Sequence, residues 1–117
     1  MNKEKSLILE RARLRLNVVA LQHDLSIERM AKELGMCRSN FIRAFKKVYA
    51  KCPLEYCQEI RLKKAIDLLK EDRYMMKEIA DMIGMSSIYH FSKWFKDRTG
   101  TSPTNYDANE NISLCDY

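Results

Sequence analysis

Apolar residues recur every three to four positions along most of the chain, which is the period of an amphipathic helix. Near the start, Leu9, Ala12, Leu16 and Val19 follow this period, with charged residues between them. Serine, proline and glycine residues separate the apolar segments, as they do at helix ends. The pattern predicts helices that include 11–23, 27–34, 38–49, 53–71 and 77–83, another from Ser86 or Ser87 to about Arg98, and a short one from Pro103.

The second half of the chain repeats the first. A shift of 49 positions places Ala31, Gly35 and Met36 on Ala80, Gly84 and Met85. A shift of 50 positions then matches four further residues with identical ones: Phe41 with Phe91, Phe45 with Phe95, Lys46 with Lys96 and Pro53 with Pro103. One additional residue in the second turn explains the change of offset. The chain therefore contains two copies of one helix pair.

Each copy has the pattern of a helix-turn-helix that reads DNA. A short helix ends at a glycine, and the next helix places two phenylalanines, four residues apart, on its core face. The opposite face is polar and basic, with Ser39, Asn40, Arg43, Lys46 and Lys47 in the first copy and Tyr89, His90, Ser92, Lys93 and Lys96 in the second. A packed helix pair of any function has one apolar face, so the duplication of the basic positions is what favours DNA.

The predicted fold class is all-α, with about seven helices in two helix-turn-helix subdomains joined by a long linker helix. The expected domains are 1–52 and 72–107, the linker is 53–71, and 108–117 form a flexible tail. The linker has 19 residues, which would span ~28 Å as a helix. Successive major-groove faces of DNA repeat every ~34 Å. One chain could therefore present both reading helices to one side of a duplex.

Charge agrees with a polyanionic partner. The chain has 117 residues and a net charge of +5, and all 21 basic residues but only 13 of the 16 acidic ones precede residue 99. By itself such a balance also fits an ordinary solvated surface. An apolar content of 46% with only 3 Gly and 2 Pro excludes a chain that is disordered as a whole.

Other classes of function lack their sequence signals. We expect no membrane span, secretory signal, cofactor or metal, and no enzyme activity, since no glycine-rich phosphate loop or hydrolase motif occurs. Cys37, Cys52, Cys57 and Cys115 form no CxxC pair, and His23 and His90 are not spaced to complete a zinc site. We expect free thiols packed as small apolar residues.

Six motifs, in this order and spacing, resemble the DNA-binding domain of the AraC/XylS family of bacterial transcription regulators. They are MAKELGM (30–36), FIRAFKK (41–47), RLKKAIDLL (61–69), EIADMIGM (78–85), HFSKWFK (90–96) and GTSPTNY (100–106). The resemblance covers Ile27–Asp107, about 80 residues. It implies seven helices, two homeodomain-like helix-turn-helix units, and binding of double-stranded DNA in two adjacent major grooves. It also implies a cytoplasmic, nucleoid-associated protein, usually an activator that contacts RNA polymerase.

Positions matched to the family give the expected contacts with DNA. The expected base contacts are Ser39, Asn40, Ile42, Arg43, Tyr89, His90 and Lys93. The expected phosphate contacts are Arg38, Lys46, Lys47, Ser86, Ser87, Ser92 and Lys96. Among these, Arg43 and Asn40 are the preferred specificity residues, because arginine reads guanine and asparagine suits adenine.

The sequence departs from the family pattern at four positions. Ala50 replaces the glycine that normally ends the first recognition helix, and Cys37 replaces a capping serine or threonine, so that Ser39 could cap instead. Met85 stands where phenylalanine is usual. Asp107 stands where arginine is typical, which removes an expected phosphate contact.

Two other classes of function stay open. The chain could be a helical adaptor that docks on a protein such as RNA polymerase without touching DNA, which requires an apolar surface groove. It could also be a thiol enzyme using Cys37 or Cys57, with only His23 and His90 as candidate bases. Most family members carry an effector domain, so the chain is expected to be a stand-alone regulator or the C-terminal part of a longer sensor.

Overall fold

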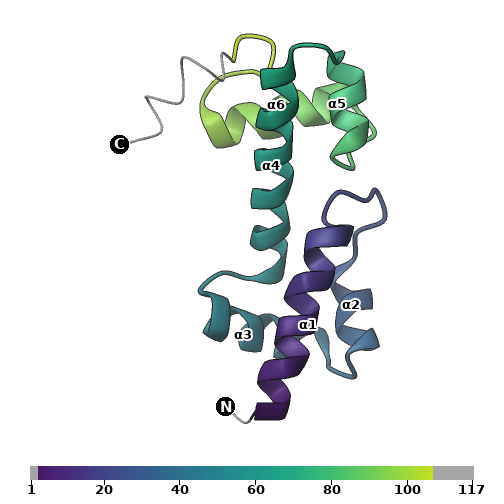
Figure 1. The fold of residues 1–117 in the computed structure, drawn as a ribbon, viewed down its shortest axis with the longest axis vertical. Helices are drawn as coiled ribbons and strands as arrows, with labels where there is room; N and C mark the ends of the chain where they lie inside the picture. Colours follow the sequence, from purple (N-terminus) through teal and green to yellow (C-terminus); the bar gives the residue numbers. More distant parts are fainter. Residues whose placement is uncertain (1–2, 107–117) are drawn as a thin grey trace. The chain divides into compact units, whose positions relative to one another are not determined.

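The computed structural model describes residues 3–106, which form six α-helices and no strand (Figure 1). The helices are α1 (Lys3–Val19), α2 (Ile27–Glu33), α3 (Arg38–Tyr49), α4 (Pro53–Glu71), α5 (Met76–Met82) and α6 (Ile88–Thr99). The contacts divide the chain into two compact units, 1–60 and 61–117, and α4 contributes residues to both. No helix in the described range combines the length and apolar character that a bilayer crossing requires.

The predicted all-α fold class is confirmed, with differences at two places. The first helix ends at Val19, whereas the apolar period predicted a helix through His23; turn bonds such as Gln22 N to Val19 O follow instead. The short helix expected from Pro103 is a turn at residues 103–105, closed by Asn105 N donating to Ser102 O at 3.1 Å. The tail expected at 108–117 lies outside the described residues.

The first unit buries one face of each of its helices. In α1, Leu9, Ala12, Leu16 and the following Ala20 are fully buried, at the i, i+3, i+7 and i+11 spacing of one helical stripe. They pack in a single core with residues of α2, α3 and α4, namely Met30, Ala31, Phe41, Ala44, Phe45 and Cys57. Full burial of one phenylalanine stabilises a fold by ~1.5–3 kcal/mol, so Phe41 and Phe45 dominate this core.

The second unit has the same plan. Its buried residues come from the second half of α4, from α5 with its turn, and from α6 and Pro103: Ala65, Leu68, Ile79, Ala80, Ile83, Met85, Phe91, Phe95 and Pro103. Arg61 is the only charged side chain that is buried among the described residues, with 8% of its surface exposed. This burial could not be predicted from the sequence, because Arg61 lies in a strongly charged stretch of the linker.

The two copies have nearly identical internal geometry. The rings of Phe41 and Phe45 meet edge-on with centroids 5.9 Å apart, and those of Phe91 and Phe95 do so at 5.8 Å. Both turns contain a glycine with positive φ, 72° at Gly35 and 88° at Gly84. After each glycine the methionine amide donates to the alanine carbonyl five residues earlier, at 2.9 and 2.8 Å. The additional residue of the second turn is Ser86, between Met85 and the cap of α6.

The repeat also includes a tyrosine pair that the sequence analysis missed. Tyr56 lies edge-on to Phe45 at 5.7 Å, and Tyr106, 50 positions later, lies edge-on to Phe95 at 5.1 Å. Both tyrosines follow the matched prolines by three residues. Each recognition helix is therefore held by the same aromatic group of two phenylalanines and one tyrosine.

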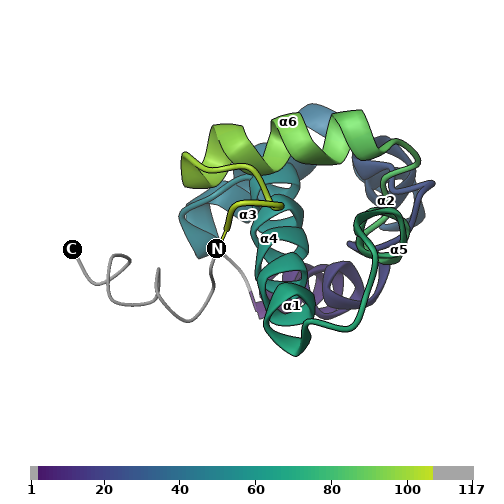
Figure 2. The same cartoon turned by 90° about the horizontal axis from the view of Figure 1, so that it is seen from above.

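The short and the long helix of the second pair cross steeply. In the second unit, Figure 1 shows α6 lengthwise, whereas Figure 2 shows α5 nearly end-on. The described contacts between elements include α2 with α3 and α5 with α6. This crossing leaves one long face of the 12-residue helix α6 without α5 upon it.

Candidate nucleic-acid interface

The outer face of α3 carries the residues predicted to contact DNA in the first copy. Phe41, Ala44 and Phe45 are buried on the inner face. Their positions turn the predicted contact residues outward. Ile42 is half-buried at the edge of this face, and the other six are exposed: Arg38, Ser39, Asn40, Arg43, Lys46 and Lys47. The helical period thus brings all the expected α3 residues to the surface of one helix.

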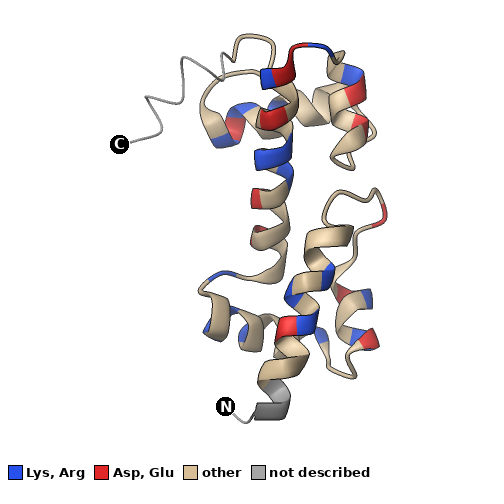
Figure 3. Ribbon diagram, in the orientation of Figure 1, with Lys and Arg blue, Asp and Glu red and all other residues tan. Residues whose placement is uncertain are grey.

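The charge of α3 is of one sign. Its 12 residues contain four basic side chains and no acidic one. Figure 3 accordingly shows blue and tan on this helix and no red. Lys46 and Lys47 lie in the last turn, where the helix dipole favours positive charge. Such a surface attracts a polyanion without any competing carboxylate on the same helix.

The outer face of α6 is less basic and more aromatic. Tyr89 exposes 88% of its surface at the start of the helix, next to exposed His90. Lys93 and Lys96 are exposed farther along, and Asp97 reduces the net charge. Of the three serines predicted to contact phosphate, Ser86 is exposed, while Ser87 and Ser92 are half-buried.

The two recognition helices begin and end differently. Ser87 is the N-cap of α6, and its hydroxyl accepts a hydrogen bond from His90 N at 3.3 Å. Cys37 is the N-cap of α3 and makes no such side-chain bond. Ser39 lies inside α3, so the expectation that it could serve as the cap is wrong. Gly100 ends α6 with φ 84°, whereas Ala50 ends α3 in the same left-handed conformation with φ 66°.

The two preferred specificity residues are bonded to each other. Arg43 Nη2 donates to Asn40 Oδ1 at 2.5 Å, across one turn of α3. Both side chains are exposed. From the sequence alone, the two residues are expected to read two bases independently.

A family model described as "Helix-turn-helix domain" matches residues 30–109, which include the last four residues of α2 and all of α3 to α6. The chain belongs to the AraC-type helix-turn-helix family. The predicted family is confirmed. AlkR, a helix-turn-helix transcriptional regulator of Acinetobacter baylyi, is 36% identical over 81 residues, which are 69% of this chain and 26% of AlkR. The chain spans about a quarter of the length of such curated relatives.

Solved structures of the family share the fold. The C-terminal domain of AraT, a response regulator from Geobacillus stearothermophilus, has a TM-score of 0.79 at 30% identity, over 85% of this chain and 82% of that domain. The DNA-binding domain of AdpA, a global transcriptional factor solved with a target DNA, has a TM-score of 0.69 at 24% identity, over 93% of this chain and 94% of that domain. At that identity the likeness to AdpA concerns the fold alone.

A cluster around Arg13 fixes α1 to the ends of α3 and α4 in this AraC-type domain. The Arg13 guanidinium lies 5.8 Å from the centre of the Tyr49 ring. Tyr56 donates its hydroxyl proton to Asn17 Oδ1 at 2.8 Å. Hydrogen bonding to the Tyr56 hydroxyl, and then to that of Tyr49, raises the pKa of Arg13 above its ordinary value. Sequence patterns did not reveal this cluster, because its members come from three helices.

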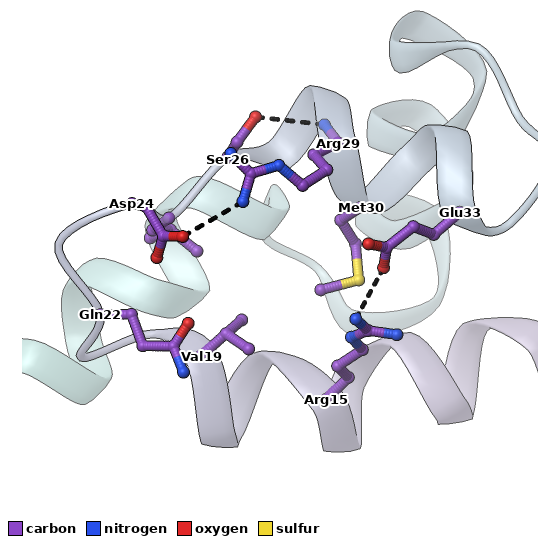
Figure 4. Close-up of a pocket in the computed structure, with 9 residues that line it drawn as sticks. Arg15, Val19, Gln22, Asp24, Ser26, Arg29, Met30 and Glu33 are labelled. Atoms are coloured by element: carbon purple, nitrogen blue, oxygen red, sulfur yellow. Dashed lines mark hydrogen bonds and ion pairs between the residues drawn. The ribbon is translucent and has the colours of Figure 1, made fainter.

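A hollow between α1 and α2 is too small for a usual ligand. Its volume is about 80 Å³, whereas sites for small molecules take roughly 300–1,000 Å³. Figure 4 shows Arg15 and Glu33 meeting beside Met30, with 2.8 Å between Arg15 Nη2 and Glu33 Oε2. In the second unit a wider hollow of about 380 Å³ opens beside Ser86 and Ile88, at the start of α6.

The described cysteines are free thiols in three different environments. Cys57 is buried in the core, as expected of a small apolar residue, and Cys52 is half-buried. Cys37 is exposed, so its predicted packing is wrong; the N-cap position of α3 turns it outward. Within residues 6–106 there is no group of three His, Cys, Asp or Glu placed to hold a metal ion. Cys115 lies outside the described residues.

Proposed function

We propose that this chain is a sequence-specific, double-stranded DNA-binding transcription regulator in which α3 enters one major groove and α6 enters the next. The observation that carries the proposal is the duplication: two matched helix pairs each expose a basic face on the second helix. An AraC-type family and the DNA in the AdpA structure support it further. The 19 residues of α4, about 28 Å of helix, suit the separation of adjacent grooves.

The proposed roles follow side-chain chemistry. Arg43 and Asn40 on α3, and Tyr89, His90 and Lys93 on α6, face the bases, together with Ser39 and Ile42. Phosphates are held by the lysines and Arg38, which neutralise charge, and by the serine hydroxyls near the start of α6. The domains proposed from the sequence, 1–52, 53–71 and 72–107, assign one reading helix to each end.

We also propose how the whole protein is controlled, how it acts on transcription and where in the cell it acts. Relatives such as AlkR are about four times longer than the matched region, and we propose that an effector domain or sensor partner controls this one. We propose that it acts as an activator through RNA polymerase, in the bacterial cytoplasm at the nucleoid. It needs no enzyme activity for this role.

The test is selection of bound sites from a random duplex pool, followed by affinity measurements on the recovered site. Arg43→Ala should weaken the recovered site by ~1–3 kcal/mol, which is about 5- to 150-fold, and relax the preference at one base pair. Arg29→Ala is the matched control, since Arg29 is exposed but bonded to Asp24 at 3.3 Å. It should change neither quantity.

One result would reject the proposal, and another would change only the role of Arg43. A chain that folds but recovers no preferred sequence, and is retained on RNA polymerase alone, would be the helical adaptor. Equal weakening of the selected site and of random DNA by Arg43→Ala would make Arg43 a phosphate contact.

A further inference from the structure

Arginines on the surface of this domain differ in their polar partners. Three that lie outside the recognition helices contact carboxylates: Arg15 with Glu33 at 2.8 Å, Arg29 with Asp24 at 3.3 Å, and Arg73 with Glu71 at 3.5 Å. Arg43 instead donates to the neutral amide of Asn40. A carboxylate partner orients a guanidinium and also neutralises it. An amide partner orients it and leaves the positive charge in full.

Asn40 and Arg43 lie where an oriented guanidinium could reach a base. Asn40 and Arg43 are three residues apart, which places them on the same face of α3. Both side chains are exposed. A free arginine side chain loses rotamer entropy on forming a fixed contact. One bond from Asn40 uses one of five guanidinium N–H groups, so the others remain for a base.

The same bond changes what Asn40 can read. Bidentate recognition of adenine by asparagine uses the amide oxygen as an acceptor and the amide nitrogen as a donor. In this structure Oδ1 of Asn40 already accepts from Arg43. Arg43 occupies one of the two lone pairs of this oxygen and so sets the orientation of the Asn40 amide, which an adenine contact would otherwise have to set.

We propose that Asn40 is a positioning residue that aligns the charged Arg43 guanidinium for one guanine, and that it is not itself a reader of adenine. This inference rests on the proposed function. If the inference holds, Asn40 and Arg43 together read one base pair. The sequence alone predicted two independent base contacts.

The test is a double-mutant cycle with Asn40→Ala, Arg43→Ala and the combined variant. Each protein is measured on the selected site and on the same site with the guanine of the Arg43 contact replaced. Asn40→Ala should reduce the preference for that guanine by about tenfold. In the Arg43→Ala background it should reduce that preference no further, because the oriented group is gone.

Asn40→Asp separates positioning from base reading. The aspartate retains the oxygen that accepts from Arg43 but lacks the amide donor, and it lies in the first turn of α3, where negative charge suits the helix. It should keep the guanine preference while weakening binding to all duplexes. An adenine reader would lose its adenine preference with this substitution, and that loss would overturn the inference.

Other outcomes are equally decisive. If Asn40→Ala relaxes a separate adenine position and the two single effects add, Asn40 is an independent reader and the inference fails, although the proposed function stands. If the unaltered chain selects no sequence from the pool, the proposed function itself fails. Thermal melting compared with Arg73→Ala, an exposed arginine outside α3, checks that each variant is folded.

Discussion

Lys96 shows how one exposed charge can be assigned a role. It lies in the last turn of α6, is exposed, and occupies the same place in its copy as Lys46. We have placed it at a phosphate, where a lysine acts as a point charge and releases one counterion on binding.

Lys96→Ala should weaken binding to every duplex and make the slope of log K against log salt shallower by about 0.9. Affinity measured at several salt concentrations gives this slope. Arg73→Ala removes the same charge from a site paired with Glu71, and should leave the slope unchanged. A slope unaltered by Lys96→Ala would remove Lys96 from the phosphate contacts.

At the scale of single residues, the sequence could predict which side chains of α3 are exposed. The apolar period fixes Phe41 and Phe45 inward, and so turns Arg43 and Lys46 outward whatever their rotamers. The bond between Asn40 and Arg43 depends on rotamers, and the Arg13 cluster depends on how three helices pack. Neither the bond nor the cluster produces a periodic pattern in the sequence from which it could be predicted. Whether the outward residues contact bases or phosphates remains a prediction.

At the level of the helix, the two copies differ most at their ends. The C-terminal residue that caps α3 is an alanine in the left-handed region, φ 66°, and its counterpart in α6 is a glycine at φ 84°. An L-residue pays roughly 1–2 kcal/mol for this conformation relative to the right-handed one.

Ala50→Gly should therefore raise the free energy of unfolding by about 1 kcal/mol, and Gly100→Ala should lower it by a similar amount. A Cβ at Gly100 would meet no atom within 4 Å, so the second change isolates the backbone effect. Urea denaturation measures both. Shifts of the same sign would show that backbone conformation does not control these two ends.

The N-caps of α3 and α6 allow a second matched pair of substitutions. Cys37→Ser places a hydroxyl at the uncapped start of α3 and should stabilise the fold by about 1 kcal/mol. Ser87→Ala removes the bond to His90 N and should destabilise it by about as much. Thermal and urea unfolding of the two variants test this. A neutral Cys37→Ser would indicate that packing alone fixes the start of α3.

Helix bounds were predicted best where caps and period agree. The segments 38–49 and 53–71 were found with the bounds that the sequence predicts, because Pro53 starts one helix and strong apolar stripes run through both. The end of α1 was missed because apolar spacing continues past Val19 into the turn. Pro103 resembles Pro53 in sequence, but only turn bonds follow it within the described residues.

For the molecule as a whole, the proposed function predicts how strongly the affinity for DNA depends on salt. Four basic residues are assigned to phosphates: Arg38, Lys46, Lys47 and Lys96. Each neutralised phosphate contributes a slope of ~−0.9. Binding to the selected duplex should therefore show a slope of roughly −3 to −4 in log K against log salt. A slope near zero would indicate that duplex DNA is not the partner.

The close match of the two aromatic frames has a consequence for altering sequence preference. Because both phenylalanine pairs and their tyrosines adopt one geometry, either frame should accept the outward residues of the other. Exchanging the outward residues of α3 with those of α6, while leaving the aromatic groups in place, should reverse the order of the two half-sites along the duplex. The outer faces of the two reading helices would then be interchangeable, because the same aromatic core supports both.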